Sequence, residues 1–212
     1  MTQNRSFIHR FEPGTRLEAP PLLLLHGTGG DENDLLPLGR AVSPGSALLS
    51  VRGQVLEHGM PRFFRRLAEG VFDEDDVVRR AHELADFVED ARKQYGIAAP
   101  IALGYSNGAN IAAAMLLLRP SVLAGGLLVR AMVPLSRPPE ADLAGRPVLI
   151  LSGLRDPIIS SENGETLAAM LHNAGADVDR RVVPVGHELS QTDLLLAQQW
   201  MAERSVPAPH EA

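Results

Sequence analysis

The stretch Ile101–Met115, IALGYSNGANIAAAM, is the part of the sequence that best indicates the fold. It begins as an apolar run typical of a buried strand and continues as an alanine-rich run typical of a helix. Ser106 lies between the two runs, with Gly104 and Gly108 two positions away on either side. This Gly-Tyr-Ser-Asn-Gly segment fits the pattern G-x-S-x-G, in which a sharp strand-to-helix turn exposes a serine hydroxyl at the edge of a sheet. The stretch therefore predicts a strand, a tight turn with Ser106 at its tip, and a helix.

The same alternation of strand and helix signals continues along the chain. Continuous apolar runs favour strands that are buried on both faces, and strands that alternate with helices favour a mostly parallel sheet covered on both sides. We therefore predict an α/β fold. The predicted strands are Phe7–Phe11, Leu22–Leu25, Ala47–Val51, Ile101–Gly104, Gly125–Val129, Val148–Leu151 and Arg181–Val185. The predicted helices are Asp34–Val42, Val77–Tyr95, Asn107–Leu118, Glu162–Ala174 and Leu189–Glu203.

The loops after four of these strands carry residues suited to chemistry. In parallel sheets, ligands bind at the carboxyl ends of the strands. The second predicted strand is followed by a glycine-rich loop in LLLLHGTGGDEND, residues 22–34. Later strand ends supply, in chain order, Ser106, Asp156 and His187. These side chains are therefore expected to meet at one edge of the sheet.

The three side chains form a complete set for nucleophilic catalysis. A serine hydroxyl needs a base to take its proton, and His187 is the best candidate. The imidazole in turn needs a carboxylate that fixes its tautomer, for which Asp156 is the best candidate. The chain order Ser, Asp, His is the order found with the G-x-S-x-G turn. An oxyanion needs N–H donors, and we expect the backbone amides of Thr28 and Asn107 to supply them.

Other acidic and histidine residues fit these roles less well. Asp177 and Asp179 precede the predicted last strand, and Asp193 lies in a predicted helix. His26 stands directly before Gly27, where we expect it to hold the glycine-rich loop by hydrogen bonds rather than to transfer a proton.

Composition limits the classes of function. The chain has 212 residues, no cysteine and a formal net charge of −6. The absence of cysteine excludes disulfides, thiolate metal sites and a cysteine nucleophile. The negative net charge argues against a nucleic-acid partner. No His, Asp and Glu cluster has metal-ligand spacing, so we expect neither a metal nor another cofactor. No apolar run could span a bilayer and no signal-peptide pattern is visible, so we expect a cytoplasmic protein.

Five blocks in register make the chain similar to a known family. The blocks are LHGTGGDENDLLPL, GMPRFFRRLAEGVFDEDD, GYSNGANIAAAML, GLRDPII and GHELS, which together reach nearly the whole chain. The sequence resembles the α/β-hydrolases of the phospholipase/carboxylesterase family, and within it the small bacterial carboxylesterases linked to hydroquinone resistance. The resemblance implies a sheet of about seven strands with no separate cap domain. It also implies Ser106, Asp156 and His187 as the triad, Thr28 and Asn107 as oxyanion donors, and often a homodimer.

The resemblance also bears on the limits of the domain and on function. We expect residues 1–204 to form a single domain and residues 205–212 to form a flexible tail. The predicted activity is hydrolysis of small carboxylic esters through an acyl-enzyme. An acyl-thioesterase of the same mechanism and a non-catalytic ligand-binding homologue are the alternatives.

Large apolar side chains gather in residues 57–76, EHGMPRFFRRLAEGVFDEDD. This segment follows the carboxyl end of the third predicted strand and has no clear period, so we interpret it as a loop near Ser106. We expect Met60, Phe63 and Phe64 to line a substrate pocket for short acyl chains. For Phe72 we expect burial against the sheet.

Overall fold

The computed structural model describes residues 7–16 and 18–204, and the predicted tail at 205–212 lies outside these residues. Its main sheet has seven strands, of which β1 runs antiparallel to β3 and all other neighbours are parallel. In spatial order the strands are β1 (His9–Glu12), β3 (Leu48–Val51), β2 (Leu22–Leu25), β8 (Ile101–Tyr105), β9 (Gly125–Val129), β10 (Pro147–Gly153) and β11 (Asp177–Val183). The predicted mostly parallel α/β architecture is confirmed.

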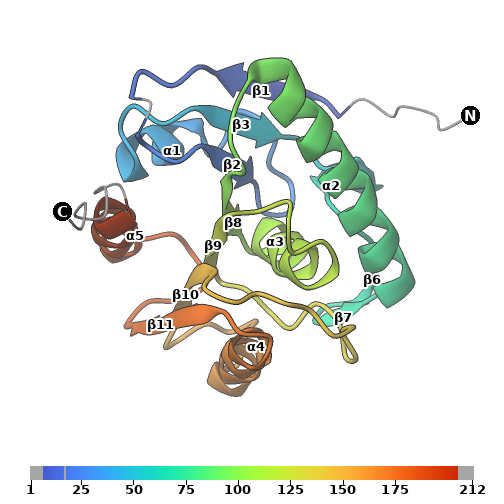
Figure 1. Ribbon diagram of the computed structural model, residues 1–212. Coiled ribbons are helices and arrows are strands. Elements are labelled where there is room, and N and C mark those ends of the chain that lie inside the picture. The colour runs from blue at the N-terminus through green and yellow to red at the C-terminus, as the bar shows by residue number, and fades with distance from the viewer. Residues whose placement is uncertain (1–6, 17, 205–212) are drawn as a thin grey trace, which may run out of the picture.

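Helices cover both faces of the sheet (Figure 1). One face carries α1 (Leu36–Val42) and α5 (Gln191–Arg204). The other face carries α2 (Glu74–Tyr95), α3 (Asn107–Leu118) and α4 (Ser161–Asn173). No separate cap domain is formed by the described residues.

The core consists of two apolar layers, one on each side of the sheet. All four leucines of β2 are fully buried. Because successive side chains of a strand point to opposite faces, Leu23 and Leu25 pack toward α2 and α3, whereas Leu22 and Leu24 pack toward α1 and α5. Burial on both faces explains why these central strands read as unbroken apolar runs in the sequence.

The last strand begins four residues before its predicted start. β11 spans Asp177–Val183, not Arg181–Val185. It lies at the edge of the sheet, and polar residues occupy most of its positions, so it carries no continuous apolar run. Pro184 cannot donate to a ladder, which agrees with the strand ending at Val183. The expectation that Asp177 and Asp179 precede this strand is therefore wrong. Both lie in its first half, beside Pro147 and Leu149 of β10, and Asp179 pairs with Arg181.

The segment expected to be a loop contains two small antiparallel hairpins. The first pairs β4 (Val55–Glu57) with β5 (Met60–Arg62), and the second pairs β6 (Arg66–Ala68) with β7 (Val71–Phe72). Gly59 and Gly70 have positive φ angles of 82° and 74° in the two turns, a conformation that glycine adopts without strain. These strands are too short to show a period, which is why the sequence pattern did not reveal them.

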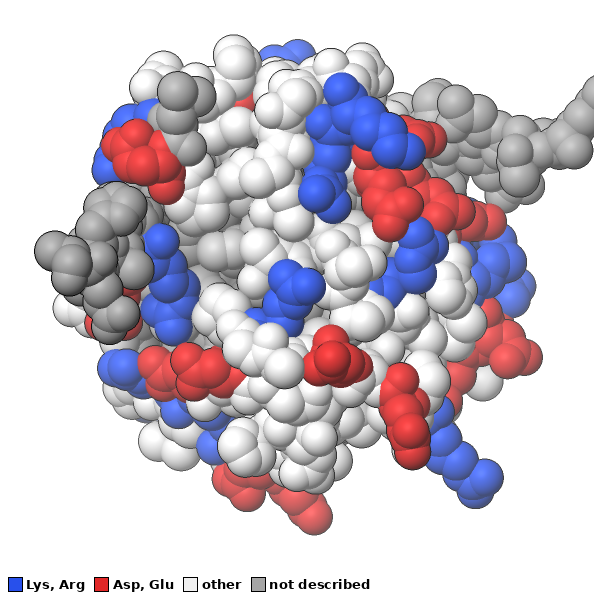
Figure 2. Space-filling view, viewed as in Figure 1, with Lys and Arg blue, Asp and Glu red and all other residues white. Residues whose placement is uncertain are grey.

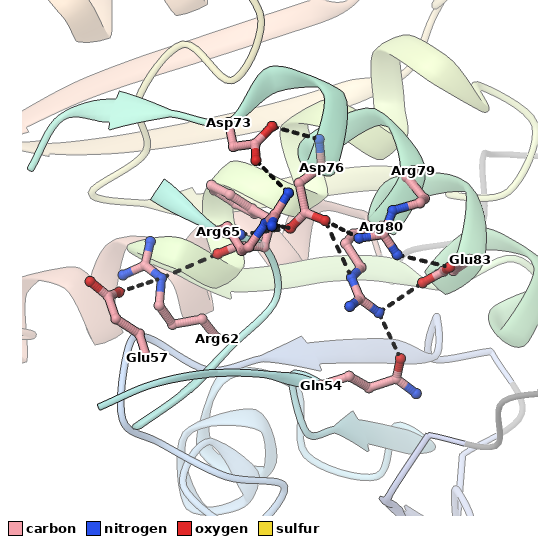
Figure 3. Close-up of polar contacts among 10 residues, drawn as sticks. Gln54, Glu57, Arg62, Arg65, Asp73, Asp76, Arg79, Arg80 and Glu83 are labelled. Carbon is pink, nitrogen blue, oxygen red and sulfur yellow. Dashed lines mark hydrogen bonds and ion pairs between the residues drawn. The ribbon is translucent and has the colours of Figure 1, made fainter. Parts of the chain in front are cut away.

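A polar network joins this hairpin segment to the start of α2 (Figure 3). Asp73 caps the helix by accepting a hydrogen bond from Asp76 N at 3.2 Å. The Asp76 side chain is fully buried, accepts from Arg65 N at 2.8 Å, and pairs with Arg79 and Arg80. The buried carboxylate therefore fixes the chain between the two hairpins.

The surface carries both basic and acidic side chains (Figure 2). On the face shown in Figure 2, basic and acidic side chains are interspersed, without a broad region of one sign. Among residues 7–16 and 18–204, no helix is both long enough and apolar enough to cross a lipid bilayer.

Candidate active site

Ser106 lies in a strained turn between β8 and α3. Its φ and ψ angles are 51° and −114°, outside the regions that a non-glycine residue favours. Close packing accounts for the two flanking glycines. A Cβ atom on Gly108 would lie 2.0 Å from Leu25 O, and one on Gly104 would lie 2.6 Å from Ala109 Cα. Only glycine fits at both positions, so the sequence around Ser106 fixes the turn that exposes its hydroxyl.

A continuous chain of hydrogen bonds joins Ser106, His187 and Asp156. Ser106 Oγ lies 2.9 Å from His187 Nε2, and His187 Nδ1 lies 2.8 Å from Asp156 Oδ2. Because the carboxylate can only accept, Nδ1 is the nitrogen that donates to Asp156. Nε2 is then the imidazole nitrogen that remains to accept the serine proton. The structure thus brings together the three side chains predicted from three separate strand ends.

The Asp156 carboxylate is held in place by the loop after β10. Its Oδ1 accepts hydrogen bonds from Ile158 N at 2.8 Å and Ile159 N at 3.0 Å. Its side chain is only 1% exposed. With Oδ1 occupied by backbone amides, Oδ2 is directed at His187, an orientation suited to fixing the imidazole tautomer.

A buried arginine holds the loop that carries His187. Arg130 follows β9, has a positive φ of 55° and is 1% exposed. Its guanidinium donates to Gly186 O at 3.0 Å and Glu188 O at 3.1 Å, on the two sides of His187. It also binds both carboxylate oxygens of Asp193, at 2.9 and 2.8 Å. Sequence reasoning missed this residue, and its signal was an arginine directly after a fully apolar strand.

Tyr105 supports His187 from another side. Its hydroxyl donates to His187 O at 3.1 Å, and the two ring centroids lie 5.7 Å apart. Burial raises the pKa of the Tyr105 hydroxyl, which keeps it a neutral donor at neutral pH. The residue before Ser106 therefore positions the histidine that Ser106 contacts.

The glycine-rich loop after β2 is organised by His26, as the sequence predicted. His26 is buried, donates from Nδ1 to Gly27 O at 2.6 Å and accepts from Gly53 N at Nε2 at 3.0 Å. Burial lowers the pKa of its imidazole. Both ring nitrogens are used in these backbone contacts, so His26 is bound within the loop rather than available for proton transfer.

A cavity of about 230 Å³ opens beside Ser106. Thr28 and Asn107, the predicted oxyanion donors, both line it. Asn107 begins α3, whose first-turn amides have no acceptors within the helix. The other lining residues are Arg62, Arg66, Glu69, Gly70, Phe72, Tyr105, Asn110, Met132, Ile158, Ile159 and His187.

The predicted pocket residues Met60, Phe63 and Phe64 do not line this cavity. Phe63 and Phe64 are buried in the core at 3% and 0% exposure, and Phe63 N binds Asn107 Oδ1 at 2.7 Å. Met60 is 40% exposed and lies near Gly29. Phe72 packs against the core as expected, with its ring 5.0 Å from that of Phe64, and it also lines the cavity. The prediction that Phe63 and Phe64 line the pocket was therefore wrong, because both side chains are buried in the core between the two hairpins.

Within residues 7–16 and 18–204, no group of three or more His, Asp and Glu side chains is arranged to hold a metal ion.

Comparisons with known proteins identify relatives over nearly the full length. The chain is 48% identical over 200 residues to "Putative hydrolase MhqD" of Bacillus subtilis (strain 168), covering 93% of this chain and 99% of that protein. The crystal structure of a Bacillus cereus carboxylesterase is 45% identical and superposes with a TM-score of 0.92 over 96% of this chain and all of that one. A Mesorhizobium loti carboxylesterase structure is 33% identical, with a TM-score of 0.88 over 92% and 94% of the two chains.

No family model matches the chain. The full-length relatives nevertheless all carry hydrolase or carboxylesterase names, and both solved structures superpose on this chain. They also agree with the sheet order and the helices on both faces described above. This chain therefore belongs to the phospholipase/carboxylesterase family of α/β-hydrolases and is a hydrolase of the carboxylesterase type.

Proposed function

We propose that the protein cleaves small carboxylic esters through an acyl-enzyme formed on Ser106. The observation that carries this proposal is the unbroken chain of hydrogen bonds from Ser106 Oγ through the His187 imidazole to Asp156 Oδ2. The strained turn at Ser106 and the adjoining cavity support it, because they make the hydroxyl accessible to a small substrate.

In the acylation step, Ser106 Oγ attacks the ester carbonyl carbon while His187 Nε2 takes the hydroxyl proton. The carbonyl π electrons move to oxygen and give a tetrahedral oxyanion. The oxyanion then collapses, the bond to the alcohol oxygen breaks, and His187 returns the proton to the leaving alcohol. The acyl group remains on Ser106. Asp156 stabilises the imidazolium that forms between the two proton transfers.

Deacylation repeats these steps with water as the nucleophile. His187 takes a proton from water, the resulting hydroxide attacks the acyl carbon, and the carboxylic acid leaves as Ser106 regains its proton. The backbone amides of Thr28 and Asn107 are the proposed donors to both oxyanions. Their support is that both residues line the cavity at Ser106, and that the partial positive charge at the start of α3 favours an anion there.

The size and lining of the cavity favour short acyl groups. A volume of about 230 Å³ lies below the range of about 300–1,000 Å³ that is typical of drug-sized ligands. Phe72, Met132, Ile158 and Ile159 supply its apolar wall. We therefore propose short-chain esters as substrates, now on the basis of this wall rather than of Met60, Phe63 and Phe64.

The proposal is tested with p-nitrophenyl esters of increasing chain length, measured beside the matching acyl-thioesters. We expect ester hydrolysis that is fastest for short chains and is abolished by Ser106→Ala. The matched control is Ser121→Ala, since Ser121 is exposed after α3 and does not line the cavity. Faster turnover of thioesters would favour the thioesterase, and binding of esters without turnover would favour a non-catalytic homologue. A cytoplasmic location and a homodimer remain predictions.

A further inference from the structure

Two arginines line the cavity that holds Ser106. Arg62 ends β5 and is 3% exposed, and Arg66 begins β6 and is partly exposed. Burying a guanidinium costs free energy unless its charge and its N–H groups find partners. The groups that pair with Arg62 and Arg66 therefore indicate which ligand charge the cavity favours.

The two guanidinium groups share one carboxylate. Glu57 lies 3.2 Å from Arg62 Nε and 2.9 Å from Arg66 Nε, and Figure 3 shows its pairing with Arg62. The remaining bonds of Arg62 go to neutral oxygens, from Nη1 to Thr28 Oγ1 and from Nε to Phe64 O. One negative charge thus faces two positive charges. Burial and then the neighbouring charge of Arg66 lower the pKa of Arg62, as expected where positive charge is in excess.

Several donors of these two groups have no protein partner. Nη2 of Arg62 and both Nη atoms of Arg66 form no hydrogen bond with the residues the structure describes. None of these atoms is enclosed in the core, since none belongs to the buried polar atoms that lack a partner. The Nε atoms are the ones that contact Glu57, so the Nη donors remain for a ligand, and a guanidinium can bind a carboxylate with two parallel hydrogen bonds.

The acidic side chain on the lining does not cancel this excess. Glu69 also lines the cavity, but it is exposed in the turn between β6 and β7. It forms no ion pair with Arg62 or Arg66 in the described part of the chain. The positive charge at the wall is therefore open to an anion that enters the cavity.

We propose that the preferred substrates are short esters that carry a second, ionised carboxylate. Arg66 binds this carboxylate through its Nη atoms, and Arg62 adds a donor from the same wall. The small cavity requires that the carboxylate and the ester group lie close together in the substrate. This inference rests on the proposed function, because it assumes that Ser106 attacks an ester bound in this cavity.

The test compares charged and neutral esters of matched size. One pair places the charge on the acyl side, ethyl hydrogen glutarate against ethyl pentanoate. The other places it on the alcohol side, 3-acetoxybenzoate against 3-acetoxybenzamide. In at least one pair, the wild type should prefer the anion in kcat/KM by about tenfold or more, because hydrogen bonds to charged groups contribute enough for such a factor. The preference should shrink at high salt, since part of the attraction is screened.

Substitutions of Arg66 and of its neighbour Arg65 then test which arginine causes the preference for anionic esters. Arg66→Gln should lower the ratio of anionic to neutral kcat/KM to about one, whatever happens to the absolute rates. Arg65→Gln removes the same charge one residue away and should keep the wild-type ratio, because Arg65 pairs with Asp73 and does not line the cavity. Arg62 is not the test position, since it also binds Thr28.

The outcomes separate this inference from the proposed function. If the wild type hydrolyses the neutral esters but prefers the anionic ester in neither pair, the inference is overturned and the proposed function stands. A preference that persists unchanged in Arg66→Gln also overturns it. If no ester of either kind is hydrolysed, the proposed function itself fails.

Discussion

Two regions meet at the cavity beside Ser106, and they are built differently. The loops after β8, β10 and β11 extend from strands that are hydrogen-bonded into the seven-stranded sheet, and they bring Ser106, Asp156 and His187 within hydrogen-bond distance. Another part of the cavity wall comes from the hairpins in residues 55–72, whose ladders contain only two or three residue pairs. Packing of the sheet fixes Ser106, Asp156 and His187, whereas turns, ion pairs and the buried carboxylate of Asp76 fix the hairpins. The difference indicates that reactivity and selectivity can be altered separately in this molecule.

The largest expected effect lies in the sheet-anchored region. Arg130→Met would leave the Asp193 carboxylate buried without its cation, which typically costs about 3–5 kcal/mol. The His187 loop would also lose its bonds at Gly186 O and Glu188 O, so kcat/KM should fall together with the free energy of unfolding. Urea denaturation and ester hydrolysis measure the two effects.

The matched control for this prediction is Arg119→Met. Arg119 pairs with Asp86 and Glu89 at the surface, where removal of an ion pair costs about 1 kcal/mol or less. Equal losses of stability in the two variants would contradict the role given to Arg130.

A pair of glycine substitutions compares the two regions directly. Gly108→Ala places a Cβ 2.0 Å from Leu25 O, so the turn at Ser106 must shift. Overpacking of this kind typically costs about 1–3 kcal/mol, and the hydroxyl should lose its alignment. Gly59→Ala has open space in the first hairpin turn and should cost only the strain of its positive φ, roughly 1–2 kcal/mol.

The readout for the glycine pair is activity measured beside thermal stability. Gly108→Ala should lose most of its kcat/KM even below its melting temperature. Gly59→Ala should lose stability with little loss of activity. The comparison fails if Gly59→Ala is the more damaging variant for hydrolysis.

Acyl-chain selectivity should respond to the hairpin wall. Phe72→Ala enlarges the cavity and should move the optimum to longer acyl chains. Each added methylene that becomes buried should raise kcat/KM by up to about fourfold. Leu67→Ala, on the same hairpin but 73% exposed, is the control. Phe63→Ala should destabilise the core without moving the optimum, because Phe63 does not line the cavity. An optimum that moves in Phe63→Ala but not in Phe72→Ala would reverse this assignment.

The smallest expected effect is a dependence of stability on pH through His26. Burial lowers its pKa in the folded state, so between that value and about 6.5 the unfolded chain binds a proton that the folded chain does not. The contribution of neutral His26 is therefore fully present above about pH 6.5 and is lost as the pH falls below it. Melting temperatures from pH 8 to pH 5 should decline less in His26→Asn than in the wild type. His58→Asn, at an exposed position, should follow the wild type.

The elements that could be predicted from the sequence are those whose burial or turn geometry leaves a local pattern of residues. Strands buried on both faces gave unbroken apolar runs, and the glycines at 104 and 108 marked the turn at Ser106, so the main sheet and the meeting of Ser106, Asp156 and His187 were predictable. The start of β11 was misplaced because an edge strand tolerates polar residues. The hairpins were missed because strands of two or three residues have no period, and this error carried over to Phe63 and Phe64.

Arg130 shows a further limit of sequence patterns. Its role depends on carbonyl groups of the His187 loop and on Asp193, 63 positions later in the chain. Such a contact leaves no pattern in the local sequence, because the partners meet only after the sheet has formed. Positioning residues of this kind therefore become visible in the structure rather than in a motif.

The most direct test of the central claim is to locate the covalent adduct that a fluorophosphonate probe forms with the protein. The account predicts one adduct by intact-mass measurement, located at Ser106 by peptide mapping and absent in Ser106→Ala. Labelling should be strongly slowed in His187→Ala, because the hydroxyl then lacks the base at 2.9 Å. An adduct on another residue, or undiminished labelling of Ser106→Ala, would contradict the assignment of Ser106 as the nucleophile.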